Sequence, residues 1–567
     1  MTLESQEVRR SAGSVPGMAT IAALSLVAML YLTLCMDRTV GVFDEALILL
    51  GAARVLDGAV PHRDFYTLYG PGQFYVLAAL YKIFGVSVLV ERAWDTVVRC
   101  CSVVLVFIIV SQAASRGLAI LAAAASLVCL GSFGSFGYPV FPALAAALMG
   151  LAFLAPNLGQ VWTTSGLVAA GVCAGVIMLF RYDVGFATFG AECALLAFCI
   201  WFQSWNRARC LRTILHCLIL FGLGFAVVVV PVATAFALCG ALPDLVFDVV
   251  TFPAEFYVKM RSLPFPRLSS LRADPAAFAV YLPLVLCVAA MPTIVATARY
   301  RWGSESVGEC GGQRRPAREA SPWTLLGLVI LTLVFFGKGV VRVSTIHMAM
   351  ALITSLALAC VLAQPVPGRG LAGRTMVVVA LLAGSVFTLS CLRTGLQNAL
   401  QNIAWARDPA SWELPTSGLP PASGSCRMPA GLERLACFRT SAATIETILY
   451  VQHRTAADDP VFIGLPWHDR IVVSDVLLYF GMNRPPATKW YEFDPGLQTS
   501  APIQQEMVGE LQRAKPKLIV IDASWSEVRE PNDSVLSSGV TVLDDYLRNA
   551  FEPVATFGSN TIMRARS

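Results

Sequence analysis

Two adjacent carboxylates, Asp44 and Glu45, follow the first long apolar stretch of the chain. Neighbouring residues on one helical turn point in different directions, so one carboxylate can face a reacting hydroxyl while the other orients a partner. Acidic residues at the end of an apolar span are rare, which favours a functional site over a solvated interfacial pair. The pair therefore predicts acid–base chemistry in this segment, which also holds aromatic residues and a Gly-Pro-Gly turn at 70–72.

The composition indicates that lipid surrounds much of the chain. Of its 567 residues, 56% are hydrophobic and only 14% are charged, which is more apolar surface than a soluble protein buries in its own cores. The net charge of +5 is not gathered into a stripe with interleaved aromatics, so nothing points to nucleic acid. The 16 cysteines form no CxxC pair that would argue for zinc.

A helix needs about 20 apolar residues to cross the hydrocarbon core of a bilayer. Eleven stretches meet or approach this length, and we expect a mainly α membrane protein with about eleven transmembrane helices. They are residues 18–36, 95–114, 117–132, 138–155, 164–180, 184–203, 213–239, 276–298, 322–337, 345–363 and 375–392. A further apolar stretch at 73–85 is shorter and carries Lys82, so we expect a re-entrant or interfacial helix there.

The arginines indicate which loops share a side of the membrane. If residues 73–85 do not cross, the arginine-rich loops and the N-terminal tail 1–17 all fall on the cytoplasmic side. The first apolar run is too long for a signal peptide and lacks a small-residue cleavage site, so it should remain as the first span. The opposite side then holds residues 37–94, a short loop near 133–139, residues 181–183, 240–275 and 337–347, and everything after Leu392.

The C-terminal part of the chain has a different character. Residues 393–430 are rich in Pro, Gly, Ser and Asn, and we place a linker at 393–437. Residues 438–567 have the pattern of a soluble α/β domain. Its expected helices are 442–454, 472–480, 503–514 and 543–549, and its expected strands are 460–464, 517–522, 555–557 and 561–563.

Two further features of this domain bear on its role. The sequence contains neither a Walker loop nor a strand–GxGxxG–helix pattern, so nucleotide binding is unsupported and an accessory or acceptor-docking role is favoured. Cys426 and Cys437 could form a disulfide if the domain faces an oxidising compartment, or remain free thiols.

The order of motifs in the membrane part resembles a known family. A first span is followed by the Asp-Glu pair, Arg63-Asp64-Phe65, the turn at 69–72 and an apolar segment that ends in Phe-Gly. Over residues 18–392 this is similar to the integral-membrane glycosyltransferases of the GT-C fold, in particular the bacterial dolichyl-phosphate-mannose-type and lipid A aminoarabinose transferases. The stretches 180–185 and 342–347 fit a more local bacterial pattern, although Ser344 stands where relatives often carry an Asp.

The resemblance implies a GT-C-like transmembrane domain at 18–392 whose first external loop, 37–94, is catalytic. It implies a multi-pass protein of the bacterial inner membrane, with the N-terminus cytoplasmic and the 438–567 domain periplasmic or extracellular. The donor would be a sugar on a polyprenyl phosphate, and the acceptor an envelope glycan, lipid or protein. Transfer would be a single displacement that inverts the sugar carbon. No cofactor is certain, and a divalent cation could take part.

The resemblance also implies roles for single residues. Asp44 matches the base of the family, and Glu45 would orient Asp44 or the acceptor. Arg181 and Arg342 are the candidates for the phosphate because guanidinium groups pair with phosphate oxygens bidentately. Lys338 and His347 would stand behind them.

The remaining candidates have competing interpretations. Asp183 and Asp64 could bind substrate, and Tyr69 is a further candidate for substrate binding. Asp183 could instead form a salt bridge with Arg181, and Asp64 could pair with Arg63 rather than bind sugar hydroxyls or a divalent ion. His347 could be a capping or core histidine.

Three alternative functions stay open. A transporter or flippase for a lipid-linked glycan would also have many spans, but its charges should lie at mid-membrane on broken helices. A polysaccharide polymerase or ligase should have a large external loop between late spans rather than an acidic pair after the first. A catalytically inactive scaffold that binds a partner is a third alternative.

Overall fold

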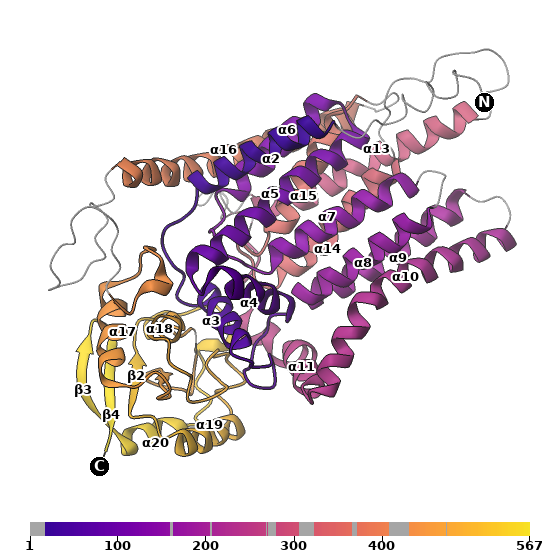
Figure 1. Cartoon of the computed structure of the whole chain (residues 1–567). Helices are drawn as coiled ribbons and strands as arrows, with labels where there is room; N and C mark the ends of the chain where they lie inside the picture. Colours follow the sequence, from indigo (N-terminus) through magenta and orange to yellow (C-terminus); the bar gives the residue numbers. More distant parts are fainter. Residues whose placement is uncertain are drawn as a thin grey trace.

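The computed structural model describes residues 17–158, 163–203, 207–267, 269, 279–305, 322–365, 371–407, 430–471 and 473–566. Long helices run side by side in a bundle, and a smaller domain with a β-sheet covers one end of it (Figure 1). Short helices of the first external loop lie between the bundle and this domain (Figure 1). The functional candidates are therefore held between two parts that are far apart in the sequence.

Each of the eleven expected spans is a helix of the bundle. The helices are α2 (Met18–Leu34), α5 (Val88–Ala113), α6 (Arg116–Leu130), α7 (Val140–Asn157), α8 (Thr164–Phe180), α9 (Tyr182–Gln203), α10 (Arg207–Leu238), α13 (Leu282–Glu305), α14 (Pro322–Val340), α15 (Ala349–Ala363) and α16 (Leu371–Arg407). Within the described residues, six of them (α5, α9, α10, α13, α14 and α16) are long and apolar enough to cross a membrane, and the other five are shorter apolar helices. The expectation of a multi-pass α-helical membrane protein is confirmed.

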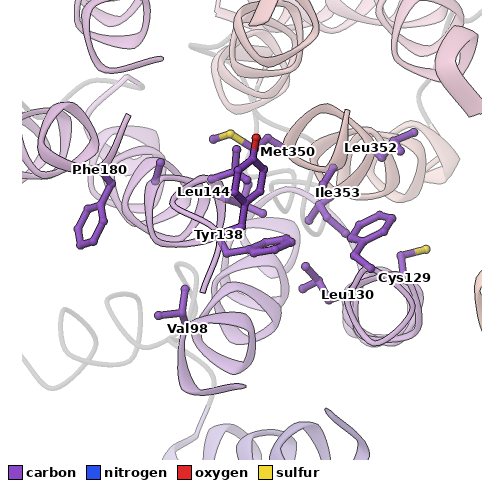
Figure 2. Packing of buried hydrophobic residues seen from close by; sticks show 14 of the residues in the cluster. Val98, Cys129, Leu130, Tyr138, Leu144, Phe180, Met350, Leu352 and Ile353 are labelled. Atoms are coloured by element: carbon purple, nitrogen blue, oxygen red, sulfur yellow. The ribbon is translucent and has the colours of Figure 1, made fainter. Parts of the chain in front are cut away.

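The helices pack through large apolar side chains and small residues. Leu144 of α7 and Ile353 of α15 are both fully buried in one cluster (Figure 2). Gly171 of α8 lies directly against the backbone of α10, where an added Cβ would be 2.0 Å from the carbonyl oxygen of Phe221. Small residues permit this close approach of two helices in a membrane. Exposed apolar side chains such as Val227 of α10 are left for lipid.

Two helices of the first external loop are too short to cross. Helices α3 (Asp44–Leu56) and α4 (Gly72–Phe84) have 13 residues each, or about 20 Å at 1.5 Å per residue. The hydrocarbon core is about 30 Å thick. The length of α4 agrees with the expected non-crossing helix at 73–85.

Two helices, α5 and α16, have boundaries that differ clearly from those expected. Helix α5 begins at Val88 rather than at residue 95, because Glu91 and Arg92 lie in its first turns and lower the local hydropathy although both are buried. Helix α16 continues to Arg407, past the expected start of the linker after Leu392. Residues 408–429 of that linker lie outside the described residues.

A chain of short helical segments leads from α10 back towards the bundle. These are α11 (Leu242–Val246), the π-helical segments η1 (Phe247–Thr251) and η2 (Pro253–Tyr257), and α12 (Val258–Arg261). Their residues Phe252 and Tyr257 pack in the same cluster as residues of the C-terminal domain. The segment therefore joins the bundle to that domain.

The C-terminal domain is an α/β unit, as expected. Its described elements are η6 (Glu433–Leu435), α17 (Ala442–Arg454), β1 (Phe462–Gly464), α18 (Leu477–Met482), α19 (Ala501–Ala514), β2 (Leu518–Asp522), η7 (Asp533–Val535), α20 (Val542–Ala550), β3 (Phe551–Phe557) and β4 (Asn560–Ala565). The sheet order is β1-β2-β4-β3, with β1 and β2 parallel and the other pairs antiparallel. Helix α18 starts later than the expected residue 472, because the amide of Val476 bonds the carbonyl of Val42 instead. Cys437 is in a disulfide, and its expected partner Cys426 lies outside the described residues.

Candidate active site

Asp44 stands in the first turn of α3 with its side chain exposed. Its Oδ1 accepts a hydrogen bond of 2.8 Å from the hydroxyl of Tyr69. Tyr69 is held there by the Gly-Pro-Gly turn that follows it, because Gly70 lies so close to α8 that an added Cβ would be 2.3 Å from the carbonyl oxygen of Leu179. The turn thus brings the first external loop against the end of α8.

Glu45 points the other way, into the protein. It is 3% exposed and accepts two hydrogen bonds from Arg92, at 2.7 and 2.9 Å, and one from the amide of Gly41 at 2.6 Å. Arg92 also donates to the carbonyls of Asp37 and Thr39, at 3.0 and 2.8 Å. These hydrogen bonds hold both ends of the segment that precedes α3 in place. The adjacent acids therefore have different surroundings: one is open and the other is fully paired.

Charged residues of α5 also bind the loop between α6 and α7. Asp95 and Arg99 form an ion pair of 2.8 Å one helical turn apart. Arg99 also donates to the carbonyls of Leu130, Phe133 and Gly134 in the loop between α6 and α7. Glu91 accepts from the amide of Gly137 in that loop. Charged residues spaced three or four apart within 91–99 were the available signal for this network, which the sequence analysis missed.

Tyr138, which ends that loop, lies at the centre of the candidate site. Its ring meets the ring of Tyr69 edge to face at 6.1 Å between centroids, and that of His347 at 6.3 Å. The Nζ of Lys338 lies 5.6 Å from the centre of the Tyr138 ring. Figure 2 shows Tyr138 among packed apolar residues such as Leu144. Asp44 is thereby linked, through Tyr69 and Tyr138, to residues some 300 positions further along the chain.

Three of the four cationic candidates already have partners. Arg181 pairs with Asp183, with hydrogen bonds of 3.0 and 2.6 Å, which is the alternative that the sequence left open. Arg342 donates to both carboxylate oxygens of Glu530 in the C-terminal domain, one at 2.9 Å.

His347 is hydrogen-bonded to Ser344 at 2.6 Å. Burial, together with the charges of Lys338, Arg342 and Arg181, holds the pKa of His347 well below its usual value. The imidazole is therefore neutral near pH 7 and adds no charge to the site.

Lys338 differs from the other three. Its Nζ is buried and has no hydrogen-bond partner among the described residues. It interacts electrostatically with Arg181, Asp183 and Asp44. A buried amino group without a hydrogen-bond partner is costly, so this position suits an anionic ligand that accepts hydrogen bonds from it.

Asp64 lies in an ion pair of 2.8 Å with Arg63 and accepts from the amide of Val60 at 2.7 Å. This is the ion-pair interpretation considered for it above. Both contacts lie within its own loop, so they do not link Asp64 to the group around Tyr138.

The C-terminal domain adds buried carboxylates beside the first external loop. Asp494 accepts a hydrogen bond of 3.0 Å from Tyr66 and one of 3.2 Å from Arg261. Burial and, as the second cause, the charge of Asp494 raise the pKa of Glu492 well above its usual range. Glu492 also interacts electrostatically with Asp44. No local pattern marks these residues, because their partners lie hundreds of positions away.

A second buried pair joins the loop to η1. His62 Nδ1 lies 3.0 Å from Asp248 Oδ2, and both side chains are buried. Burial lowers the pKa of His62 to about 3, and burial with the nearby charge of Asp244 raises the pKa of Asp248 to about 9. The pair is therefore uncharged at neutral pH and shares one proton.

Metal-ligating residues do not gather at this site. Among the described residues there is no group of three or more His, Cys, Asp or Glu side chains that could hold a metal ion. The suggestion that a divalent cation takes part stays a prediction.

The whole chain is similar in structure to ArnT from Cupriavidus metallidurans bound to undecaprenyl phosphate, at 13% identity and a TM-score of 0.56 over 97% of this chain and 98% of that one. The apo state of the same protein gives 13% identity and a TM-score of 0.55 over 96% and 98%. This chain has the GT-C fold. The resemblance read from the motifs is thereby confirmed at the level of the fold. No protein-family model matches the sequence, and no curated protein matches it.

The arabinofuranosyltransferase AftD from Mycobacteria is also similar, at 14% identity and a TM-score of 0.47, over 98% of this chain and 40% of that one. Within the GT-C fold of the present chain, Asp44 and Tyr69 come from the first external loop, and Lys338 and His347 from the end of α14 and the loop after it. The fold thus brings Asp44 and a cationic group to the same end of the bundle.

Proposed function

We propose that this chain is a membrane glycosyltransferase that moves a sugar from a polyprenyl-phosphate donor to a hydroxyl of an envelope glycan, lipid or protein. The observation that carries the proposal is the exposed carboxylate of Asp44, held by Tyr69 and linked through Tyr138 to the Lys338 amino group, which has no hydrogen-bond partner among the described residues. The GT-C fold, and the undecaprenyl phosphate bound by the similar ArnT structure, support it.

Asp44 is the general base of the proposed reaction. The acceptor oxygen attacks the anomeric carbon of the sugar from the face opposite the phosphate. A carbon–oxygen bond forms there while the bond from that carbon to the phosphate oxygen breaks, so the configuration inverts. The acceptor proton passes to Asp44, and polyprenyl phosphate leaves as the anion. The hydrogen bond from Tyr69 occupies Oδ1 and leaves Oδ2 for the acceptor hydroxyl.

Lys338 is the group best suited to the leaving phosphate. Negative charge grows on the phosphate as the bond breaks, and a positioned cation in a partly buried site stabilises it. Arg181 and Arg342 are already paired with carboxylates, so each would have to exchange a partner to bind phosphate directly. We assign them the secondary role of raising the positive potential around Lys338.

Glu45 is a positioning residue in this proposal. Its bonds to Arg92 and Gly41 hold the turn from which Asp44 projects.

The proposal also includes an orientation in the membrane. The N-terminus would be cytoplasmic, and the site with the C-terminal domain would face the periplasm or the cell exterior.

Mass spectrometry of envelope glycans and lipids tests the proposal directly. Cells that lack the gene are complemented with the wild type, with Asp44→Asn, or with Asp57→Asn as a control on the same loop. We expect one glycan or lipid species to lose a sugar in the deletion strain and in the Asp44→Asn strain only. An unchanged glycan and lipid profile in the deletion strain, under conditions in which the wild type is expressed, would refute the proposal.

A further inference from the structure

The helical segment 242–261, which comprises α11, η1, η2 and α12, carries a row of exposed apolar side chains. Val246, Val250, Ala254 and Val258 are exposed and lie four positions apart, and Phe247 next to Val246 is exposed as well. Residues four apart lie on one face of a helix, so these five side chains form a single row, which we call the apolar stripe. A contiguous apolar row, unlike a single exposed side chain, marks a surface that binds another apolar body.

The opposite face of the segment is buried against the rest of the protein and includes charged residues. Asp248 is 3% exposed and lies 3.0 Å from His62 of the first external loop. Arg261 is 4% exposed and pairs with Asp494 of the C-terminal domain at 3.2 Å. These contacts fix which side of the segment faces the protein, and they leave the apolar stripe on the outside.

The polar exposed residues of the segment lie beside the stripe. Glu255 and Lys259 are both exposed and four positions apart, so they share a face next to that of Ala254 and Val258. A water-facing amphipathic helix buries its apolar side and exposes its charges. Here an apolar row and a charged row are both exposed, which is typical of a helix that lies in a membrane surface.

The stripe begins where a lipid-facing span ends. Val227 and Val230 of α10 are 67% and 57% exposed, and Leu238 at the end of this helix is 84% exposed. Gly240, with a φ of 72°, then turns the chain into α11, which lies at the end of α10 (Figure 1). The apolar stripe therefore continues the lipid-facing surface of α10 at the edge of the hydrocarbon core.

We propose that the segment 242–261 lies in the surface layer of the bilayer, with the apolar stripe inserted among the lipid chains and with Glu255 and Lys259 at the headgroups. The partner is phospholipid of the leaflet on the side of the candidate site. Insertion is driven by the removal of apolar surface from water. The inference does not depend on the proposed reaction.

The inserted segment also reaches the candidate site. Tyr257, which precedes Val258 of the stripe, interacts electrostatically with Asp44 and Arg342. One segment thus contacts lipid on one face and the candidate site on another. Its insertion holds the candidate site at the level of the lipid headgroups.

Photo-crosslinking to lipid tests the proposal in the full chain, reconstituted in nanodiscs of dioleoylphosphatidylcholine. The variants are Phe247→p-benzoylphenylalanine and Val250→p-benzoylphenylalanine, and mass spectrometry after illumination measures the share of protein that has gained the mass of one lipid. The apolar face of a helix in the membrane surface lies about 5–10 Å inside the headgroup boundary, so we expect lipid adducts at both positions. Two separate positions keep the test valid if one variant misfolds.

Two further positions calibrate the yield of lipid adducts. Val227→p-benzoylphenylalanine, on the lipid-facing side of α10, is the positive control. Val554→p-benzoylphenylalanine, on the edge strand β3, is the matched negative control, because Val554 and Phe247 have the same exposed fraction, 38%. We expect yields at 247 and 250 within about threefold of that at 227 and about tenfold above that at 554.

Yields at 247 and 250 no higher than that at 554 would overturn the proposal. Crosslinks from these positions to a second copy of the chain, in place of lipid, would also overturn it, because the stripe would then be an interface between proteins.

Discussion

The two neighbouring acids at the start of α3 should respond differently to the loss of their charge. Glu45→Gln alters a carboxylate that accepts three hydrogen bonds and faces a guanidinium, that of Arg92, which is itself only 2% exposed. Arg92 would be left as a buried charge without its main counter-ion. Asp44→Asn changes an exposed group whose side chain accepts one hydrogen bond from the described residues, and Asn can still accept it from Tyr69.

The magnitudes follow from these contacts. Removing one partner of a buried ion pair costs about 3–5 kcal/mol. Arg92 keeps two backbone carbonyls, and Glu91 lies 3.6 Å away, so we expect the lower end, about 3 kcal/mol, for Glu45→Gln. In a chain of this size that lowers the melting temperature by about 2–3 °C. Asp44→Asn should stay within about 0.5 kcal/mol of the wild type, as exposed substitutions usually do.

Differential scanning fluorimetry of the purified variants measures the melting temperature, and an assay of sugar transfer by the same preparations measures the activity. We expect Glu45→Gln to be unstable yet partly active, and Asp44→Asn to be stable and inactive. The reasoning is refuted if Glu45→Gln melts with the wild type while abolishing transfer, since Glu45 would then be part of the reaction.

Three further outcomes follow from the site and the C-terminal domain. Lys338→Met should lower the rate of sugar transfer by about 10²–10³ while Lys338→Arg keeps part of it, and equal kinetics for all three proteins would remove Lys338 from the phosphate site. A double-mutant cycle on Arg342→Ala and Glu530→Ala should give a coupling of about 1–2 kcal/mol in unfolding, because the pair is mostly buried, and a coupling near zero would contradict the contact. Burial, together with the charge of Asp522, raises the pKa of Asp475 to about 7. Because the raised pKa makes the folded protein bind a proton more tightly than the unfolded chain, protonation of Asp475 contributes to the free energy of unfolding. This contribution is complete below about pH 4 and is lost by about pH 7. Asp475→Asn should remove that part of the pH dependence of melting, and an identical pH profile would argue against it.

Hydropathy and charge predicted the membrane part well, because a span of apolar residues is a local property. All eleven expected stretches are helices, and the short stretch at 73–85 became the 13-residue helix α4. The start of α5 was placed too late, because paired charges such as Glu91 and Arg92 read as polar although they are buried.

The candidate site was predicted only in part. The Asp-Glu pair lies in the loop that holds the candidate site, but which of the two acids is exposed depends on Arg92, whose contact with Glu45 no spacing rule revealed. Lys338 ranked behind Arg181 because the sequence does not reveal which cation finds a carboxylate. The contribution of Asp494 was out of reach, since its contact with Tyr66 joins residues 428 positions apart.

The central claim is that Asp44 removes the acceptor proton while a polyprenyl-phosphate bond to a sugar breaks. Single-turnover transfer from a radiolabelled polyprenyl-phosphate sugar, by protein reconstituted with an envelope acceptor fraction, measures this step. We predict that Asp44→Asn slows transfer by about 10²–10⁴ with donor binding unchanged. Transfer at the wild-type rate by Asp44→Asn would contradict the claim, as would a wild type that moves the labelled lipid across the bilayer with its sugar still attached.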